Sequence, residues 1–336
     1  MKNVAVERFT HQFIIYEETG LPERYRGKLW GVDVLHNNVV LSEIFPNGST
    51  FQTRDIERVT QGSDSWFRPV MVTPAPDGSI YIADWHDRQV NHYRNHEGDI
   101  DHDKGRIYRV RSKDKGFSKA VDIGKLPLAK LIAALGEDSR WFRRMALFEL
   151  RRRAESDRAI REHVTAEVTR RGGKSMRLSH AVDVELALMA GNSLLDGEFS
   201  APGVKGYAIQ RLVETSRGQS GLSELVSIAM TEGSAEVLGQ LAAAARRTDT
   251  PRALAIAGAI ARRDVFQNDP HLPLLVWWII EQEALEDPDS TLRLFANSRF
   301  WNHAIVENYL VERIMRRFAS EGTQRGYHYC ALLLSM

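Results

Sequence analysis

Four histidines and several carboxylates gather in one short stretch of the chain, residues 84–102. Asp84 and His86 open this stretch and directly follow a β-rich run at residues 80–83. Loops that follow strands are where folds usually carry functional side chains. Because histidine titrates near neutral pH, the stretch could bind a metal ion or move a proton. In the alternative interpretation, Asp84 braces backbone amides of its loop and the histidines are solvated.

A second set of oxygen ligands alternates along residues 99–103, as Asp99, Asp101 and Asp103. This spacing matches the first, third and fifth positions of an EF-hand loop. Lys104 stands where that loop needs glycine, and Val110 stands where its bidentate glutamate belongs, so the segment is not an EF-hand. A looser calcium site remains as the prediction, because calcium prefers carboxylates and no thiolate is nearby. In the alternative, neighbouring cations and water balance the three charges.

The elements that must position these residues are strands. Strand-like runs occur at residues 11–16, 29–34, 39–45, 51–54, 56–60, 70–73 and 80–83, and a further one ends at Val110. Asn47-Gly48 and Asp77-Gly78 are strong hairpin signals between such runs. Strands at this regular spacing, with no helical period, are typical of a sandwich, a barrel or a propeller.

Two segments with the same order of residue types favour the propeller. LWGVDVLHNNVVLSEIFPNGS and SIYIADWHDRQVNHYRNHEG share an aromatic residue, an apolar strand, Asp, His and a second strand. Asp33 and His36 thus correspond to Asp84 and His86, at an offset close to the ~40–50 residues of a four-stranded blade. Chance similarity between the two segments is the alternative.

Beyond Pro127 the apolar period becomes helical. Leu128, Leu131 and Leu135 lie on one stripe, and Asp138 or Ser139 is the expected cap of the next helix, at residues 140–153. We expect further helices near residues 157–170, 180–190, 204–216, 221–231, 234–247, 251–262, 272–286, 289–297, 303–319 and 323–335. Helices of this length in series indicate a HEAT-type solenoid, with an irregular bundle as the alternative.

The predicted fold class is therefore a β + α chain of two domains. Residues 1–112 form a partial β-propeller of about two blades, residues 113–126 a linker, and residues 127–336 an α-helical HEAT-like repeat domain.

Composition excludes several classes of function. The chain has 45 Lys+Arg and 44 Asp+Glu, so no net field indicates a nucleic-acid partner. The single cysteine, Cys330, excludes a disulfide framework and a CxxCH haem attachment within this chain. There is no P-loop, GxSxG elbow or HExxH helix. The first residues lack the apolar segment of a signal peptide, and no stretch reaches the ~18 apolar residues of a membrane span.

Several ordered motifs resemble a family of large bacterial membrane-bound dehydrogenase-like proteins. The motifs are LPERYRGKLWGVDVLHNNV, WFRPV, PDGSIYIADWHDRQVNH and GRIYRV. In that family, a propeller similar to that of glucose/sorbosone dehydrogenases precedes HEAT-like repeats, which SRWFRRMALFEL and LPLLVWWIIEQ resemble. The resemblance implies a periplasmic, quinone-dependent oxidation of sugars or alcohols, with pyrroloquinoline quinone and calcium as cofactors.

The same resemblance implies what this chain lacks. A c-type haem domain often closes such proteins, whereas this chain stops before any such domain and starts within the propeller. We therefore expect it to be inactive alone, with its missing blades supplied by other polypeptide and a c-type cytochrome as a further partner.

The resemblance also implies roles for individual residues. Arg68, together with Asp33 and His36, would hold the anionic quinone, and Asp84 and His86 would accept a hydride or proton from the substrate carbinol. A structural salt bridge is the alternative role of Arg68. The second functional hypothesis is a non-catalytic module, whose propeller face and helical solenoid bind protein or polysaccharide.

Overall fold

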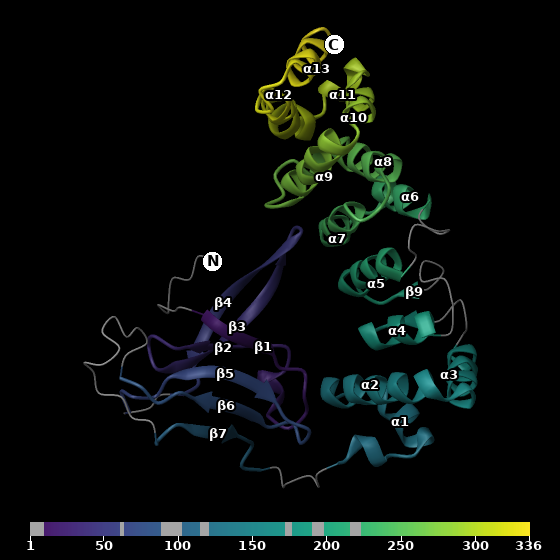
Figure 1. Cartoon of the computed structure of the whole chain (residues 1–336). Coiled ribbons are helices and arrows are strands. Elements are labelled where there is room, and N and C mark those ends of the chain that lie inside the picture. Colours follow the sequence, from purple (N-terminus) through teal and green to yellow (C-terminus); the bar gives the residue numbers. More distant parts are fainter. Residues whose placement is uncertain are drawn as a thin grey trace. The chain divides into compact units, whose positions relative to one another are not determined.

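The computed structural model describes residues 10–60, 64–88, 103–114, 121–171, 177–189, 198–215 and 223–336. Antiparallel sheets form the N-terminal part and helices dominate the C-terminal part, so the predicted β + α composition is confirmed (Figure 1). The chain divides into two compact units. The first comprises Met1–Phe45 and Phe51–Glu162, and the second comprises Pro46–Thr50 and His163–Met336.

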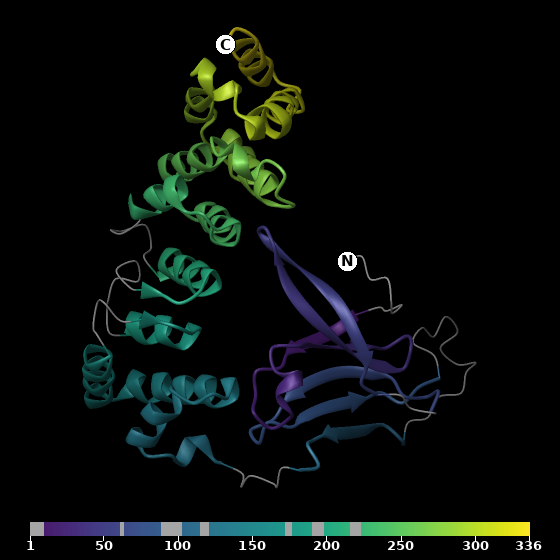
Figure 2. The same cartoon turned by 180° about the vertical axis from the view of Figure 1, so that it is seen from behind.

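Two antiparallel sheets occupy the first unit (Figure 2). The four-stranded sheet contains, in spatial order, β1 (Thr10–Ile15), β2 (Leu29–Asp33), β3 (Asn38–Asn47) and β4 (Thr50–Arg58). The three-stranded sheet contains β5 (Pro69–Pro74), β6 (Ile80–Asp84) and β7 (Arg106–Val110). These strands agree with the sequence-based prediction, except that the two runs predicted at residues 51–54 and 56–60 form one continuous strand, β4, which ends at Arg58.

Glycines and one tyrosine fix the tight turns. Gly48 (φ 60°) and Gly78 (φ 73°) occupy the left-handed region at the two predicted hairpin turns, where glycine has no steric penalty. A Cβ atom on Gly20 would lie 2.3 Å from the carbonyl carbon of Gly78, so no side chain at residue 20 fits against the Gly78 turn. The Tyr16 hydroxyl donates to the Gly78 carbonyl and accepts from the Leu21 N–H at 2.8 Å, which ties residues 20–21 to the Gly78 turn.

The two sheets of this unit share one apolar core. Side chains at most 2% exposed come from both sheets and include Trp30, Val32, Leu41, Val72, Ile80 and Ile82. Because side chains alternate along a strand, Asp84 lies on the same buried face of β6 as Ile80 and Ile82. A carboxylate therefore stands at the end of a strand whose other inward side chains are apolar.

Two helices belong to the same compact unit as the sheets: α1 (Leu128–Ala134) and α2 (Arg140–Ser156). The buried carboxylate of Glu18, which follows β1, accepts from the Trp141 backbone N–H at 3.0 Å and from the Ser139 hydroxyl. Ser139 also caps α2, as the sequence allowed. The division into units thus falls within α3 (Arg158–Arg170), whereas the sequence placed the domain boundary at residues 113–126.

The second unit is mainly helical. Its helices are α4 (Ala181–Met189), α5 (Pro202–Thr215), α6 (Ser223–Thr231), α7 (Ala235–Ala245), α8 (Thr250–Ala261), α9 (Leu272–Glu286), α10 (Pro288–Phe295), α11 (Ser298–Trp301), α12 (Val311–Ala319) and α13 (Gln324–Leu334). A short parallel pair, β8 (Arg177–Leu178) and β9 (Glu198–Phe199), lies among them, and a π-helical turn, Val306–Leu310, precedes α12. The predicted helices are present with small shifts at their ends; α11 was not predicted.

These helices pack in two successions. Within the second unit, α5, α7, α9 and α12 contact one another in series, and α6, α8, α10 and α13 do the same (Figures 1 and 2). Fully buried side chains such as Leu241, Ile256 and Phe295 form one apolar core along the unit. None of the described helices is long and apolar enough to cross a membrane.

Candidate functional site

The candidate site consists of two loops of the first unit, each of which follows a strand. Asp33 is the last residue of β2 and Asp84 is the last residue of β6. Arg68 lies between the two loops, because its Nη1 donates to the Asn37 side-chain oxygen and its backbone N–H donates to Asp84 Oδ1 at 2.8 Å. Arg68 therefore links the loop that carries His36 and Asn37 to the loop that carries His86.

Asp33 and His36 form a paired carboxylate and imidazole. Asp33 is fully buried, and its oxygens lie 2.9 and 3.1 Å from His36 Nδ1. Asp33 Oδ1 also accepts from the His36 backbone N–H at 3.1 Å, which fixes the loop. The His36 side chain is 39% exposed. A buried carboxylate that binds Nδ1 orients the ring and leaves Nε2 as the nitrogen that can accept a proton.

Asp84 and His86 have a different arrangement, in which the carboxylate holds the backbone. Asp84 Oδ1 accepts from the backbone N–H groups of Arg68 and His86, both at 2.8 Å. This bond supports the left-handed conformation of His86, whose φ is 55°. The geometry agrees with the interpretation that Asp84 braces loop amides.

His86 is much less accessible than His36. It is 7% exposed and stacks on the Trp66 ring with 5.6 Å between centroids. Its Nδ1 lies 3.7 Å from Asp84 Oδ2, and neither atom has a hydrogen-bond partner among the residues that the structure describes. A small polar group between them would satisfy both atoms, since buried polar atoms are seldom left without a partner.

Arg68 is committed to structural partners. It is 7% exposed, and besides Asn37 its guanidinium donates to the carbonyls of Phe67 at 3.2 Å and Arg88 at 2.6 Å. Burial lowers the pKa of Arg68, and the charge of Asp87 opposes this shift. Within the described part of the chain its Nε lacks a partner, and the role of Arg68 in holding an anionic cofactor stays a prediction.

The predicted calcium loop lies mostly outside the described residues, which exclude Asp99 and Asp101. Asp103 is described and is exposed. In the described ranges, no three His, Cys, Asp or Glu side chains come together in a way that could hold a metal ion. Calcium binding by residues 99–103 therefore stays a prediction.

The sequence-based reasoning missed two residues of this site. Asn37 has a φ of 59°, and its side chain donates to the Ser65 carbonyl at 2.6 Å while it accepts from Arg68. Asp64 Oδ1 accepts from the Trp66 N–H at 2.9 Å and so positions the ring that covers His86. Asparagine adopts left-handed conformations more readily than most residues, and Asp-x-x turns are common, so both signals were present but not specific.

Comparison with known proteins gives one match. Residues 2–114, about a third of the chain, match a family described as a domain of unknown function (DUF7133). The matched segment contains all seven strands of the two sheets and both loops of the candidate site. No curated protein and no solved structure matches the chain.

Proposed function

We propose that this chain is the C-terminal portion of a quinone-dependent sugar or alcohol dehydrogenase-like protein. Its two sheets would be blades of an incomplete β-propeller, and its helices a HEAT-like array. Two successive antiparallel sheets with a common core, and two successions of helices, support this architecture. The Asp33–His36 pair carries the functional proposal, because a buried carboxylate orients a partly exposed imidazole at the end of a strand.

In this proposal His36 is the base that accepts the hydroxyl proton of a substrate carbinol through Nε2. Asp33 stabilises the imidazolium that results, and the backbone bond from His36 to Asp33 keeps the ring oriented. A quinone, if bound beside this pair, would supply an acceptor for the hydride that leaves the carbinol carbon. Asp84 and His86 are positioning residues here, since Asp84 holds the backbone of the neighbouring loop.

We also propose that another polypeptide completes the β region. Closed propellers have about four to eight blades, so two sheets cannot surround a central channel. β7 is an edge strand of its sheet, and its Ile107 side chain is 75% exposed. Exposed apolar edge strands tend to pair with another chain. The completing polypeptide would supply further contacts to the quinone, and a c-type cytochrome in the periplasm would take the electrons.

A dye-coupled oxidation assay with pyrroloquinoline quinone, calcium and a panel of sugars and alcohols tests this proposal. The chain alone should show no turnover, and light scattering should show self-association; co-expression with the upstream blades should restore a monodisperse, active complex. In that complex His36→Gln should reduce the turnover number about 100-fold or more, as expected for loss of a general base.

The matched control is His180→Gln, in the second unit. His180 is also partly exposed and lies 3.6 Å from a carboxylate, that of Asp183, so the same change is made to a similar pair. Activity should be unchanged in this control. Full activity of His36→Gln in the complex would exclude His36 as the base, and turnover by a monomer of the chain alone would exclude the requirement for completion.

The alternative function, a non-catalytic binding module, is favoured by a different observation. The second unit contains an apolar groove lined by arginines, away from the Asp33–His36 pair in sequence and in a separate compact unit.

A further inference from the structure

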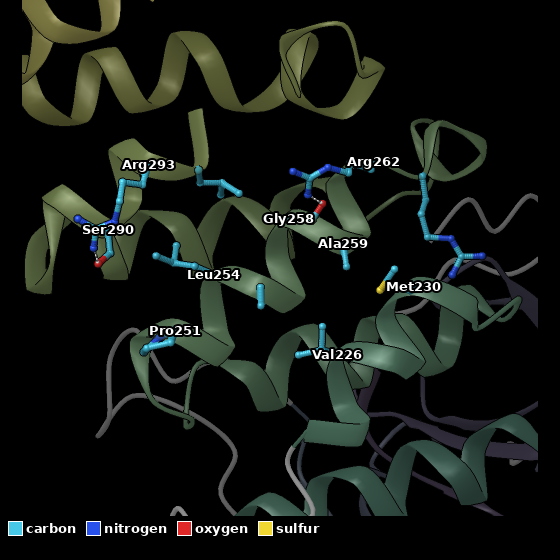
Figure 3. A pocket seen from close by; sticks show the side chains of 12 residues that line it. Val226, Met230, Pro251, Leu254, Gly258, Ala259, Arg262, Ser290 and Arg293 are labelled. Carbon is cyan, nitrogen blue, oxygen red and sulfur yellow. Dashed lines mark hydrogen bonds between the residues drawn. The ribbon is translucent and has the colours of Figure 1, made fainter. Parts of the chain in front are cut away.

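A groove of about 830 Å³ lies between α6, α8 and α10 of the second unit (Figure 3). Its floor is apolar: Val226 and Met230 come from α6, and Leu254 and Ala259 come from α8. Met230 is 65% exposed, so its apolar side chain is accessible to a ligand in the groove. Open apolar surfaces with polar groups at their margin commonly mark binding sites.

The charged residues that line this groove are all arginines: Arg262, Arg263 and Arg293. No Asp or Glu lines it. Within the described part of the chain, none of the three arginines forms an ion pair with a carboxylate, although many other arginines of this chain do. Positive charge beside an apolar floor is complementary to a ligand that is negatively charged and partly apolar.

Neutral groups hold each guanidinium in place. Arg262 donates to the Gly258 carbonyl at 2.6 Å, and its guanidinium lies 4.6 Å from the centroid of the Phe300 ring. Arg263 donates to the Ala229 carbonyl at 3.3 Å. A guanidinium has five N–H donors, so each side chain is oriented while most of its donors stay available to a carboxylate.

Arg293 is the third of these side chains. It donates to the Ser290 hydroxyl, on its own helix α10. Hydrogen bonds from Ser290 and the charge of Arg293 lower the pKa of Asp287, which caps α10 and does not line the groove. Figure 3 shows Arg293 and Arg262 apart from each other along one edge of the groove, with Leu254 and Val226 below them.

We propose that this groove binds an acidic amphipathic helix of a partner protein. Its apolar side chains would lie on Met230 and Leu254, and separate carboxylates would bind the arginines. Because Arg293 and Arg262 stand apart along the groove, a ligand that binds both must carry separated negative charges, which the single carboxylate of a fatty acid does not offer. The inference deepens the binding-module alternative and does not depend on dehydrogenase activity.

Fluorescence anisotropy with the full chain tests the proposal. The probe is a labelled helical peptide of about four turns, with leucine at i, i+3, i+4 and i+7 and glutamate on both flanks; a second peptide has glutamine in place of every glutamate. The glutamate peptide should bind saturably, and its affinity should fall as the salt concentration is raised. The affinity of the glutamine peptide should be lower by about tenfold or more.

Two variants locate the binding site, and one controls for charge. Arg293→Glu and Met230→Glu should each weaken binding of the glutamate peptide about tenfold or more. Arg246→Glu is the matched control, because Arg246 also bonds a neutral group, the Gln282 side chain at 3.2 Å, and lies outside the groove. It should bind the peptide like the wild type, and all three variants should keep the wild-type circular dichroism spectrum.

Each other outcome contradicts the proposal. Absence of saturable peptide binding, equal binding of both peptides, or equal effects of Arg293→Glu and Arg246→Glu would overturn it. Dodecanoate is the competing probe: if it binds at this groove and the glutamate peptide does not, the groove is a site for a small anionic amphiphile instead.

Discussion

Replacing Glu18 with alanine should destabilise the first unit by about 2–4 kcal/mol. Glu18 is 2% exposed, and its carboxylate accepts from the Trp141 N–H at 3.0 Å and from the Ser139 hydroxyl, at the N-terminus of α2. Hydrogen bonds to a charged group contribute about 1.5–3 kcal/mol each, and a negative charge at a helix N-terminus adds about 0.3–1 kcal/mol. The effects of two bonds at one carboxylate are not fully additive, so we expect a total of about 2–4 kcal/mol, which is less than their sum.

Urea denaturation of the full chain, combined with hydrogen exchange of the first amides of α2, measures this effect. Glu17→Ala is the matched control: its carboxylate is 38% exposed and pairs with Arg140, also in solvent, so it should cost less than about 1 kcal/mol. If Glu18→Ala costs under about 0.5 kcal/mol, or if both variants lose the same stability, the carboxylate of Glu18 does not join α2 to the β region and the reasoning is refuted.

Three further predictions concern the same unit. Gly20→Ala should lower the thermal unfolding temperature far more than Gly27→Ala, because a Cβ at Gly20 meets backbone at 2.3 Å, whereas Gly27 (φ 71°) has nothing within 4 Å and carries backbone strain alone. Burial raises the pKa of Tyr16 to about 12 from an ordinary value of 10.0. The folded state therefore keeps this proton to higher pH than the unfolded state does. The free energy of unfolding, measured with urea, should fall as the pH rises from about 10 to about 12, and it should fall less in Tyr16→Phe. A hydrogen bond from Arg152 lowers the pKa of Glu149 to about 2 from 4.5, so the stabilisation from Glu149 should be complete above pH 4.5 and should disappear as the pH falls through about 2. Glu149→Gln should lack that acid-dependent change in acid titrations followed by circular dichroism.

The local elements of this protein follow from its sequence. Alternating apolar residues predicted the strands of both sheets, and Asn47-Gly48 and Asp77-Gly78 predicted hairpin turns that the structure contains. Apolar residues at helical spacing predicted nearly every helix after residue 127, and only the four-residue α11 is too short to show such a period. These features depend on side chains a few residues apart, which is why the sequence alone reveals them.

The candidate site was predictable in part. The repeated order of Asp and His identified Asp33, His36, Asp84 and His86; the structure places the two aspartates at strand ends and the two histidines in the loops that follow. Their roles differ, however, since Asp33 binds an imidazole whereas Asp84 binds backbone amides. Identical residue types in similar sequence contexts do not specify which hydrogen bonds they form.

Only the tertiary structure determined which distant residues act together. Glu18 binds the N-terminus of a helix whose cap lies 121 residues later, so α1 and α2 join the sheets in one compact unit although their sequence period matches that of the later helices. The Arg68 guanidinium donates to the Asn37 side chain and to backbone carbonyls, and the sequence alone does not identify these partners. Arg262 and Arg263 directly follow α8, whereas Arg293 lies in α10, so these arginines line one groove only after α6, α8 and α10 have packed. Sequence period specifies which face of an element is buried, whereas the choice of partner is decided by packing between elements far apart in the chain.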